Sequence, residues 1–306
     1  MSLKITTGRV VQFRSSFYEV ETDDGIVTCQ VRGKLKQSAR DGDQVALGDL
    51  VEISLQSGGK GSVEKVLPRS GVLGRLVPTT RGAYQQVLVS NLDQVVLVFA
   101  CANPDPSLRM LDRFLVIAEK NDIPALIVAN KVDLVGLQAA ESMFSIYPEL
   151  GYTVIYTSTH AELGIDDLQQ QLSGKISAFA GPSGVGKTSL LNCIQPHLGL
   201  DVKEISTATN KGRHTTIVRR LFPLRDGGYV ADLPGLRQLA LWDIEPEELD
   251  GYFPELRPLV PYCQFSDCTH VSEPGCAVLQ ALEEGLISSE RYDSYLRMRF
   301  GEDRDI

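Results

Sequence analysis

The 306-residue sequence contains no apolar run of about 18 residues, the length that a membrane-spanning helix requires. Its first residues, Met1 to Thr7, also lack the apolar stretch of a secretory signal peptide. We therefore expect a cytoplasmic protein with no membrane partner. Internal repeats and low-complexity tracts are absent too, which leaves ordinary globular domains, two or three for a chain of this length.

The sequence contains fewer basic residues than acidic residues. Lysine and arginine total 30 against 39 acidic residues, which gives a formal net charge of −9. This balance speaks against nonspecific nucleic-acid binding by the whole chain. The basic residues gather around Arg32–Arg40 and Lys211–Arg220, and the sequence from Asp243 on is strongly acidic. Any phosphate contacts would therefore fall to local patches, although a solvated surface explains each basic cluster equally well.

Cysteine is sparse, with six residues in all. Cys29, Cys101 and Cys193 are scattered in apolar contexts, and we predict that they are buried thiols. The other three cysteines crowd into one short segment near the C-terminus. In a chain without a secretion signal, such crowding favours a metal site over disulfides.

The crowded segment reads Cys263-x4-Cys268-x-His270-x5-Cys276. Three thiolates and one imidazole are the ligand set of a closed tetrahedral structural zinc site, with no coordination position left open for catalysis. We predict one structural Zn²⁺ here. It would stabilise the fold of an acidic segment that has little apolar sequence of its own. Reduced cysteines in a loop without metal are the alternative.

Residues 1–70 predict a small β-barrel. Segments 7–14, 17–20, 26–31 and 50–55 are short, β-branched or aromatic and partly alternating, with turn residues between them. An oligonucleotide-binding (OB) barrel is the best-known fold of this size. An SH3-like barrel would give much the same sequence pattern.

Residues 71–242 predict an α/β domain. Apolar strands are expected at 94–100, 125–129, 153–156, 176–180 and 228–231, and helices at about 108–120, 138–145, 165–172 and 189–194. This alternation indicates βαβ units that form a parallel sheet with helices on both faces. We expect the remaining residues, 243–306, to form a C-terminal zinc-binding unit that is mainly helical, with helices at 277–284 and 290–299.

A phosphate-binding loop lies between a predicted strand and a predicted helix. The segment matches the G-x-x-x-x-G-K-[ST] pattern in full, so its backbone N–H groups can point at phosphate oxygens and the helix N-terminus can add its positive end. We expect Lys187 to reach the β- and γ-phosphates and Thr188 to bind Mg²⁺. The predicted nucleotide-binding residues of this loop are Gly181, Pro182, Ser183, Gly184, Val185, Gly186, Lys187, Thr188 and Ser189.

A base-reading motif follows the predicted strand 125–129. Asp133 can accept hydrogen bonds from both the N1 and N2 donors of guanine, while the Asn130 amide meets the acceptor side and the Lys131 stem lies over the base. Adenine has no donor at N1 and no N2 amino group, so it would leave the carboxylate desolvated and without a partner on the base. Ser158 ends the next strand, where backbone N–H groups could donate to guanine O6. These residues favour GTP and GDP over adenine nucleotides.

Two further loops have the composition of nucleotide-sensing switches. Asp232 would hold Mg²⁺ through water, and Gly235 could sense the γ-phosphate. In the loop Gly212-Arg213-His214-Thr215-Thr216, one threonine could bind Mg²⁺, and Thr216 is our catalytic candidate beside Lys187. His214 either orients water or is a solvated loop histidine.

A glutamine often follows the switch glycine in GTPases and orients the attacking water. Here that position is Leu236, which cannot polarise water. We therefore predict slow intrinsic hydrolysis that a partner accelerates by completing the site.

The five elements are those of a GTPase, but their order along the chain is unusual. The base-reading residues Asn130–Asp133 and Ser158 precede the phosphate loop Gly181–Thr188, whereas the phosphate loop ordinarily comes first. Such a circular permutation preserves the fold when the original chain ends lay close together. It also makes the second switch lead directly into the C-terminal unit.

With these motifs in place, the whole chain resembles the circularly permuted, ribosome small-subunit-dependent GTPases of bacteria. The permuted order, Gly212–Thr216 and the Cys263/Cys268/His270/Cys276 set carry the resemblance. It implies an N-terminal OB barrel, a permuted GTPase domain and a C-terminal zinc domain. It also implies that the protein hydrolyses GTP to GDP and phosphate, binds the 30S subunit and its 16S rRNA, is stimulated there, and assists late small-subunit maturation. Nothing in the sequence demands a dimer, so we expect a monomer.

Two other functions remain open from the residues themselves. The chain could be an RNA-binding module in which nucleotide only tunes the affinity, and a nucleotide-independent, salt-dependent RNA affinity would favour that. It could also be a permuted GTPase that acts on a protein partner through its barrel, and an acidic barrel surface would favour that.

Overall fold

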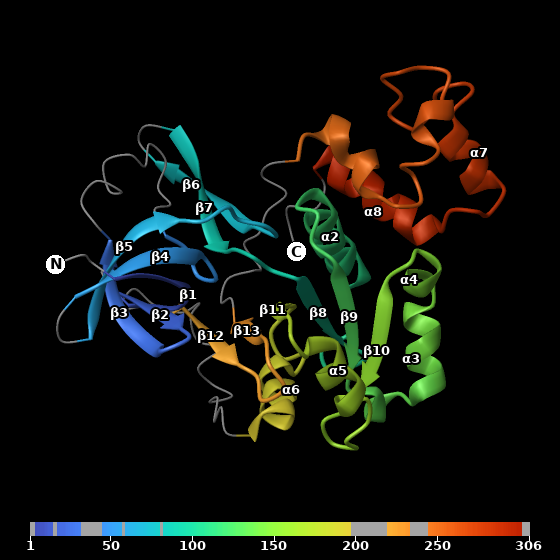
Figure 1. The fold of residues 1–306 in the computed structure, drawn as a ribbon. Coiled ribbons are helices and arrows are strands. Elements are labelled where there is room, and N and C mark those ends of the chain that lie inside the picture. Colours follow the sequence, from blue (N-terminus) through green and yellow to red (C-terminus); the bar gives the residue numbers. More distant parts are fainter. Residues whose placement is uncertain are drawn as a thin grey trace.

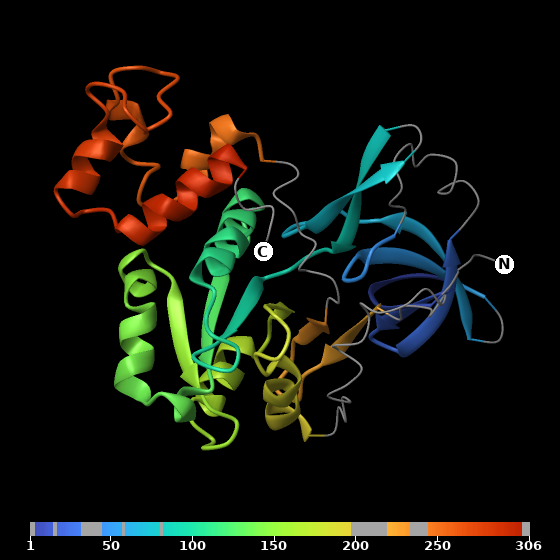
Figure 2. The ribbon, with the colours of Figure 1, turned by 180° about the vertical axis from the view of Figure 1, so that it is seen from behind.

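The computed structural model describes residues 4–14, 17–31, 45–56, 59–79, 82–196, 219–232 and 244–301. An N-terminal barrel, a central α/β sheet and a C-terminal group of helices follow one another along the chain (Figure 1). In both views the barrel lies beside one edge of the central sheet, and the C-terminal helices lie next to the helices that cover that sheet (Figures 1 and 2). In the part of the chain described, no helix combines the length and the apolar character needed to cross a bilayer.

Five strands close the barrel. They are β1 (Ile5–Arg14), β2 (Phe17–Thr22), β3 (Gly25–Val31), β4 (Leu50–Leu55) and β5 (Lys60–Val66). The order is β1-β2-β3-β5-β4, β4 returns to β1, and only the β3–β5 pair is parallel. Alternate inward side chains such as Val10, Val20 and Ile53 fill the interior. This strand order is the OB arrangement, so the SH3-like alternative is discarded.

A hairpin that the sequence pattern did not predict follows the barrel. It consists of β6 (Leu73–Thr79) and β7 (Gly82–Val89), which pair antiparallel. Leu73 and Val89 belong to the core of the α/β domain, and a backbone bridge joins Val89 to Leu47. The hairpin therefore connects the barrel region to the sheet that follows.

The central sheet confirms the predicted α/β fold. Its strand order is β10-β9-β8-β11-β13-β12, and every pair is parallel except β12–β13. The strands are β8 (Gln94–Ala100), β9 (Ala125–Asn130), β10 (Thr153–Thr157), β11 (Ile176–Ala180), β12 (Arg219–Pro223) and β13 (Tyr229–Asp232). β11 is central in the sheet but comes after β8, β9 and β10 in the chain, which is the permuted order.

Helices cover both faces of this sheet, as the buried strands predict. They are α2 (Leu108–Lys120), α3 (Leu137–Phe144), α4 (Ile146–Glu149), α5 (Ile165–Leu172) and α6 (Lys187–Ile194). Alternation along β8 sends Leu97 and Phe99 into the core under α2, α3 and α4, and Val96 and Val98 into the core under α5 and α6. The sheet is thus fixed between two apolar layers.

The barrel and the sheet join edge to edge. β1 pairs antiparallel with β12, with Gln12 opposite Arg220. Near the same seam, the Tyr229 hydroxyl donates to the Glu21 carboxylate at 2.6 Å, and the Arg9 guanidinium lies 6.0 Å from the centre of the Tyr229 ring. Backbone pairing and side-chain contacts therefore make one continuous sheet from the barrel to β10.

The C-terminal unit contains η4 (Pro246–Tyr252), η5 (Val260–Tyr262), α7 (Ala277–Glu283) and α8 (Ser289–Phe300). Its core is larger than the sequence suggested, because Leu249, Phe253, Leu256, Val278 and Tyr295 are all buried in one cluster. Val116 of α2 joins that cluster. Aromatic and aliphatic residues spread over several short elements supply this core, which local sequence patterns do not reveal.

Among the scattered cysteines, Cys29 and Cys101 are buried as predicted, and burial raises the pKa of each thiol to about 11. Cys193 is exposed, so that prediction was wrong. It lies on α6 between Leu191 and Ile194, which face the core while Cys193 faces outward. The helical period, rather than the apolar neighbours, decides its position.

Candidate functional site

The phosphate loop turns from β11 into α6, as predicted. Gly181 has φ +140°, and a Cβ there would lie 2.1 Å from the backbone oxygen of Val98, so only glycine fits. Gly186 has φ +97° and caps α6, which begins at Lys187. The Lys187 ammonium donates to the carbonyls of Gly181 and Pro182, each at 2.7 Å. The lysine thus lies across the mouth of the loop.

The base-reading loop lies directly against the phosphate loop. β9 ends at Asn130, whose side chain is buried and donates from Nδ2 to the Val185 carbonyl at 2.8 Å. The Asn130 amide oxygen accepts from the Thr157 hydroxyl at 3.0 Å. A Cβ on Gly186 would lie 2.4 Å from Asn130 Nδ2, so the glycine permits this close packing. The two motifs, about fifty residues apart in sequence, therefore form one site.

Lys131 and Asp133 follow Asn130 at the same edge of the sheet. Lys131 adopts a left-handed backbone conformation with φ +63°, and its ammonium donates to the Gly184 carbonyl at 2.6 Å and to the Asn103 carbonyl. Asp133 is exposed, and its Oδ1 accepts from the Ser158 hydroxyl at 2.5 Å. Ser158 is itself buried and also accepts from the Ala161 amide. The carboxylate is oriented yet open to a ligand.

The electrostatics of this edge suit a polyphosphate with a base attached. Two ammonium groups, on Lys131 and Lys187, and the N-terminus of α6 supply positive charge around the glycine loop. Thr188, in the first turn of α6, is nearly buried beside them. At the far end, the Asp133 carboxylate supplies an acceptor for a base that carries donors.

Several predicted residues fall outside the described part of the chain. These are His214, Thr215, Thr216, Gly235 and Leu236, together with the basic cluster Arg32–Arg40. The backbone of Asp232 is described: it ends β13, opposite Phe179 of β11. β11 leads into the phosphate loop, so the second switch starts beside that loop.

Two contacts within the site were not predicted. Asn103 follows the carboxyl end of β8, and its carbonyl accepts from Lys131. Thr157 is the last residue of β10, is fully buried and holds the Asn130 amide. Both could have been found from the rule that ligand-binding residues follow the carboxyl ends of parallel strands.

The four predicted metal ligands meet in the C-terminal unit. One ligand atom from each of Cys263, Cys268, His270 and Cys276 lies within 4.8 Å of all the others. Cys263 Sγ is 4.0 Å from Cys276 Sγ, and His270 Nδ1 is 3.3 Å from Cys276 Sγ and 3.6 Å from Cys263 Sγ.

These separations can be compared with those of a real metal centre. Tetrahedral zinc with ordinary bond lengths would give about 3.8 Å between sulfurs and about 3.6 Å between sulfur and nitrogen. The residues present therefore fit a zinc ion. Without a metal, burial raises the pKa of the Cys268 thiol to about 12, so a cation is the natural partner for its thiolate.

The loop that carries His270 is held by a carboxylate. Glu273 accepts from the backbone N–H groups of Thr269, Val271 and Ser272 and from the Thr269 hydroxyl. The hydroxyl bond and the backbone bonds hold the pKa of this carboxyl well below its usual range. The ligand loop is thus ordered by its own side chains.

Replacing Gly186 with alanine is expected to weaken GTP binding at least tenfold. The new Cβ would collide with Asn130 Nδ2, and the positive φ would be strained, so the loop and the Asn130 amide would both shift. The dissociation constant of a fluorescent GTP analogue measures the effect.

Gly151→Ala is the control, because Gly151 has φ +90° but an added Cβ meets no atom within 4 Å. It should lose stability of order 1 kcal/mol and keep its GTP affinity. Equal affinities of the two variants would refute the close packing of Gly186 on Asn130.

Comparisons with known proteins agree with this geometry. Residues 66–242 match the family described as RsgA GTPase, and residues 7–63 match the RsgA N-terminal domain. The small ribosomal subunit biogenesis GTPase RsgA of Gemmatimonas aurantiaca is 45% identical over 297 residues, 96% of each chain. That of Moorella thermoacetica is 42% identical over 290 residues, 94% of each chain.

Two solved structures share the architecture. YjeQ from Thermotoga maritima superposes with a TM-score of 0.80 at 38% identity, covering 97% of this chain and 98% of that one. YloQ, described as a circularly permuted GTPase, gives a TM-score of 0.75 at 32% identity, covering 99% and 97%. On both sequence and structure, the chain belongs to the RsgA GTPase family.

Proposed function

We propose that the site at the carboxyl ends of β9, β10 and β11 binds GTP and GDP with Mg²⁺. As a member of its family the chain is a GTPase. The observation that carries the assignment of residues is the direct contact between the two loops through Asn130 and Val185. That contact gives one ligand a phosphate end and a base end.

In this proposal the phosphate end is the loop itself. Its backbone N–H groups and the Lys187 ammonium hold the phosphates, and the Thr188 hydroxyl binds Mg²⁺. The residues assigned to this end are Gly181, Pro182, Ser183, Gly184, Val185, Gly186, Lys187, Thr188 and Ser189. Asp232 adds a water-mediated contact to the Mg²⁺, and Gly235 senses the γ-phosphate.

The base end consists of Asn130, Lys131, Asp133 and the Ser158 loop. Asp133 accepts from guanine N1 and N2, and the hydroxyl of Ser158 orients it for this role. The Lys131 stem covers the base while its ammonium is tethered to the phosphate loop. Adenine has no donor at N1 and no N2 amino group, so it would give this carboxylate no partner on the ligand, which is the physical basis for selecting GTP.

For catalysis we assign Lys187 to the developing phosphate charge and Thr216, or its neighbour Thr215, to Mg²⁺. His214 is the candidate for orienting water once a partner closes its loop. Leu236 stands where many GTPases have a glutamine, which supports slow hydrolysis by the isolated protein.

We propose that the partner is the 30S ribosomal subunit with its 16S rRNA, whose late maturation the protein assists. The relatives named small ribosomal subunit biogenesis GTPases, similar over nearly the whole chain, support this. The OB barrel offers a nucleic-acid-binding fold, and clusters such as Arg32–Arg40 offer the positive charge.

Co-sedimentation with purified subunits tests the partner. The protein should pellet with 30S subunits in the presence of a non-hydrolysable GTP analogue, and less with GDP. It should stay in the supernatant with 50S subunits. Binding to 50S subunits, or to neither subunit, would contradict the proposal that the 30S subunit is the partner.

Three further assignments complete the proposal. The chain divides into a barrel (1–70), the permuted GTPase domain (71–242) and the zinc unit (243–306). The zinc unit holds one structural Zn²⁺ on Cys263, Cys268, His270 and Cys276. It acts as a monomer, because a single chain supplies both ends of the nucleotide site. Its place of action is the cytoplasm, where bacterial ribosomes assemble.

A further inference from the structure

His270 is the least ordinary of the four metal ligands. Its side chain is fully buried, and its backbone has φ +61°, a left-handed conformation that non-glycine residues rarely adopt. Such a conformation persists only where the surroundings hold it. From α8, the Tyr292 hydroxyl donates to the His270 carbonyl and the Tyr295 hydroxyl to the Thr269 carbonyl.

The two ring nitrogens of His270 meet different groups. Nδ1 faces the sulfurs of Cys276 and Cys263, at 3.3 and 3.6 Å. Nε2 lies 3.0 Å from a carboxylate oxygen of Asp250. A carboxylate oxygen accepts hydrogen bonds, so this contact assigns the ring N–H to Nε2 and leaves the Nδ1 lone pair for the metal.

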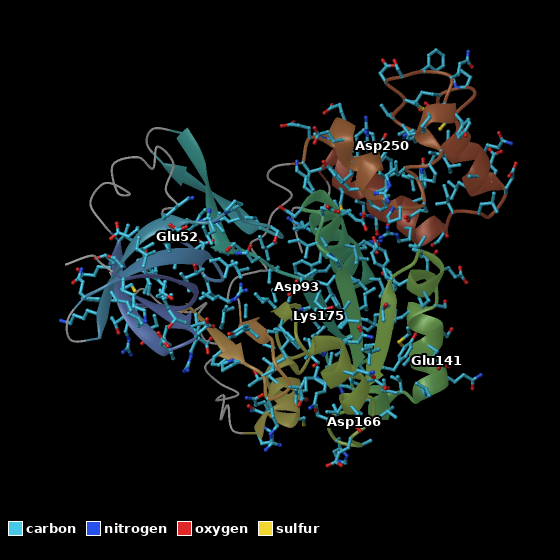
Figure 3. The ribbon with its side chains drawn as sticks, in the orientation of Figure 1. Glu52, Asp93, Glu141, Asp166, Lys175 and Asp250 are labelled. Atoms are coloured by element: carbon cyan, nitrogen blue, oxygen red, sulfur yellow. The ribbon has the colours of Figure 1, made fainter. Side chains whose placement is uncertain are left out.

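Asp250 comes from a different part of the chain. It lies in η4, which Figure 3 shows in orange beside the C-terminal helices. Its neighbour Leu249 and the nearby Phe253 are buried in the core that also contains Cys268 and Cys276. η4 packs against α8 and α2 and is the first described element after residues 233–243, which include the end of the second switch.

We propose that Asp250 is the positioning residue of the metal centre. It fixes the His270 tautomer and ring orientation, and through this bond the metal secures η4 to the rest of the C-terminal unit. The inference rests on the zinc proposed above. A carboxylate that accepts from a metal-bound histidine raises the basicity of the imidazole and typically contributes 10- to 100-fold in metal affinity.

Zinc affinity of the full-length protein tests the first part. Competition with a chromophoric chelator should show about 10- to 100-fold weaker zinc binding for Asp250→Ala. Asp250→Asn should fall between this variant and the wild type, because its amide oxygen still accepts. The control, Asp267→Asn, removes an exposed carboxylate from the same ligand loop and should bind zinc as the wild type does. GTP affinity should be unchanged in all three.

The first of two further measurements reports what a merely structural role would not change, and the second tests whether the metal and Asp250 hold η4 together. Nitrogen-15 NMR of the zinc-loaded protein should show a slowly exchanging proton on His270 Nε2, lost in Asp250→Ala and retained in Asp267→Asn. Hydrogen exchange over residues 246–252 should accelerate in Asp250→Ala and, equally, in the wild type stripped of zinc.

If the wild type binds no zinc tightly, the zinc proposal fails and this inference fails with it. If the wild type binds zinc but Asp250→Ala and Asp250→Asn bind it within twofold of the wild type, with the Nε2 proton still protected, zinc stands and the role of Asp250 is overturned.

Discussion

Replacing Asp133 with asparagine is expected to change the preferred nucleotide from GTP to XTP. Guanine presents donors at N1 and N2, both of which a carboxylate accepts, whereas xanthine carries a carbonyl oxygen in place of the N2 amine. An asparagine amide donates to that oxygen and repels the guanine amine. The affinity for GTP should fall about 100-fold or more, since an unpaired buried donor and a lost charge-assisted bond together cost about 2–4 kcal/mol.

Dissociation constants for fluorescent GTP and XTP analogues measure this exchange. Asp122→Asn is a matched control, because Asp122 is an exposed aspartate in the turn after α2 and lies outside the proposed site. It should leave both constants unchanged. If Asp133→Asn still prefers GTP by the wild-type ratio, Asp133 does not read the base.

Replacing Arg291 with methionine is expected to loosen the C-terminal unit by about 3–5 kcal/mol. Arg291 is 1% exposed and donates from Nη1 to Asp112 of α2 at 2.7 Å and from Nε to Glu255 at 2.6 Å. Asp112 also accepts from the hydroxyls of Tyr147 and Ser294. Removal of the guanidinium would leave two nearly buried carboxylates without their cation.

The charge state of Arg291 follows from its surroundings. Burial acts to lower its pKa, but the carboxylates of Asp112 and Glu255 outweigh burial and raise that pKa above the ordinary value. Arg291 therefore stays charged at every pH at which the protein is folded. This network joins α8 to α2, so it fixes the C-terminal unit on the GTPase domain.

Hydrogen exchange of the α8 backbone amides measures the loss, because it reports the local free energy of opening. Arg297→Met is the control: its partly exposed pair with Asp293, one helical turn away, should be worth less than 1 kcal/mol. Equal effects of the two variants would mean that the buried network does not hold the two domains together.

Much of the candidate site could be predicted because its chemistry depends on short, local patterns. The phosphate loop, Asn130–Asp133 and the cysteine cluster each have a fixed spacing that the nucleotide or the metal requires, so the residues could be named before their positions were known. The strands β8, β9 and β11 could also be predicted, since burial on both faces gives continuous apolar runs in the sequence.

What escaped prediction depends on partners distant in sequence. Arg291 and Asp250 look like ordinary charged residues of an acidic segment, and only the fold brings them to Asp112 and His270. The strand β5 reads Lys-Gly-Ser-Val-Glu-Lys-Val, a mixed pattern that becomes a strand because β3 and β4 flank it. The β1–β12 seam likewise joins segments about 200 residues apart.

The rate of GTP hydrolysis with and without purified 30S subunits tests the central claim most directly, with 50S subunits and Lys187→Ala as controls. We predict slow turnover of the protein alone, strong stimulation by 30S subunits and none by 50S subunits, and no stimulated activity in Lys187→Ala. Fast turnover of the isolated protein, or equal rates with 30S and 50S subunits, would contradict a site that the small subunit completes.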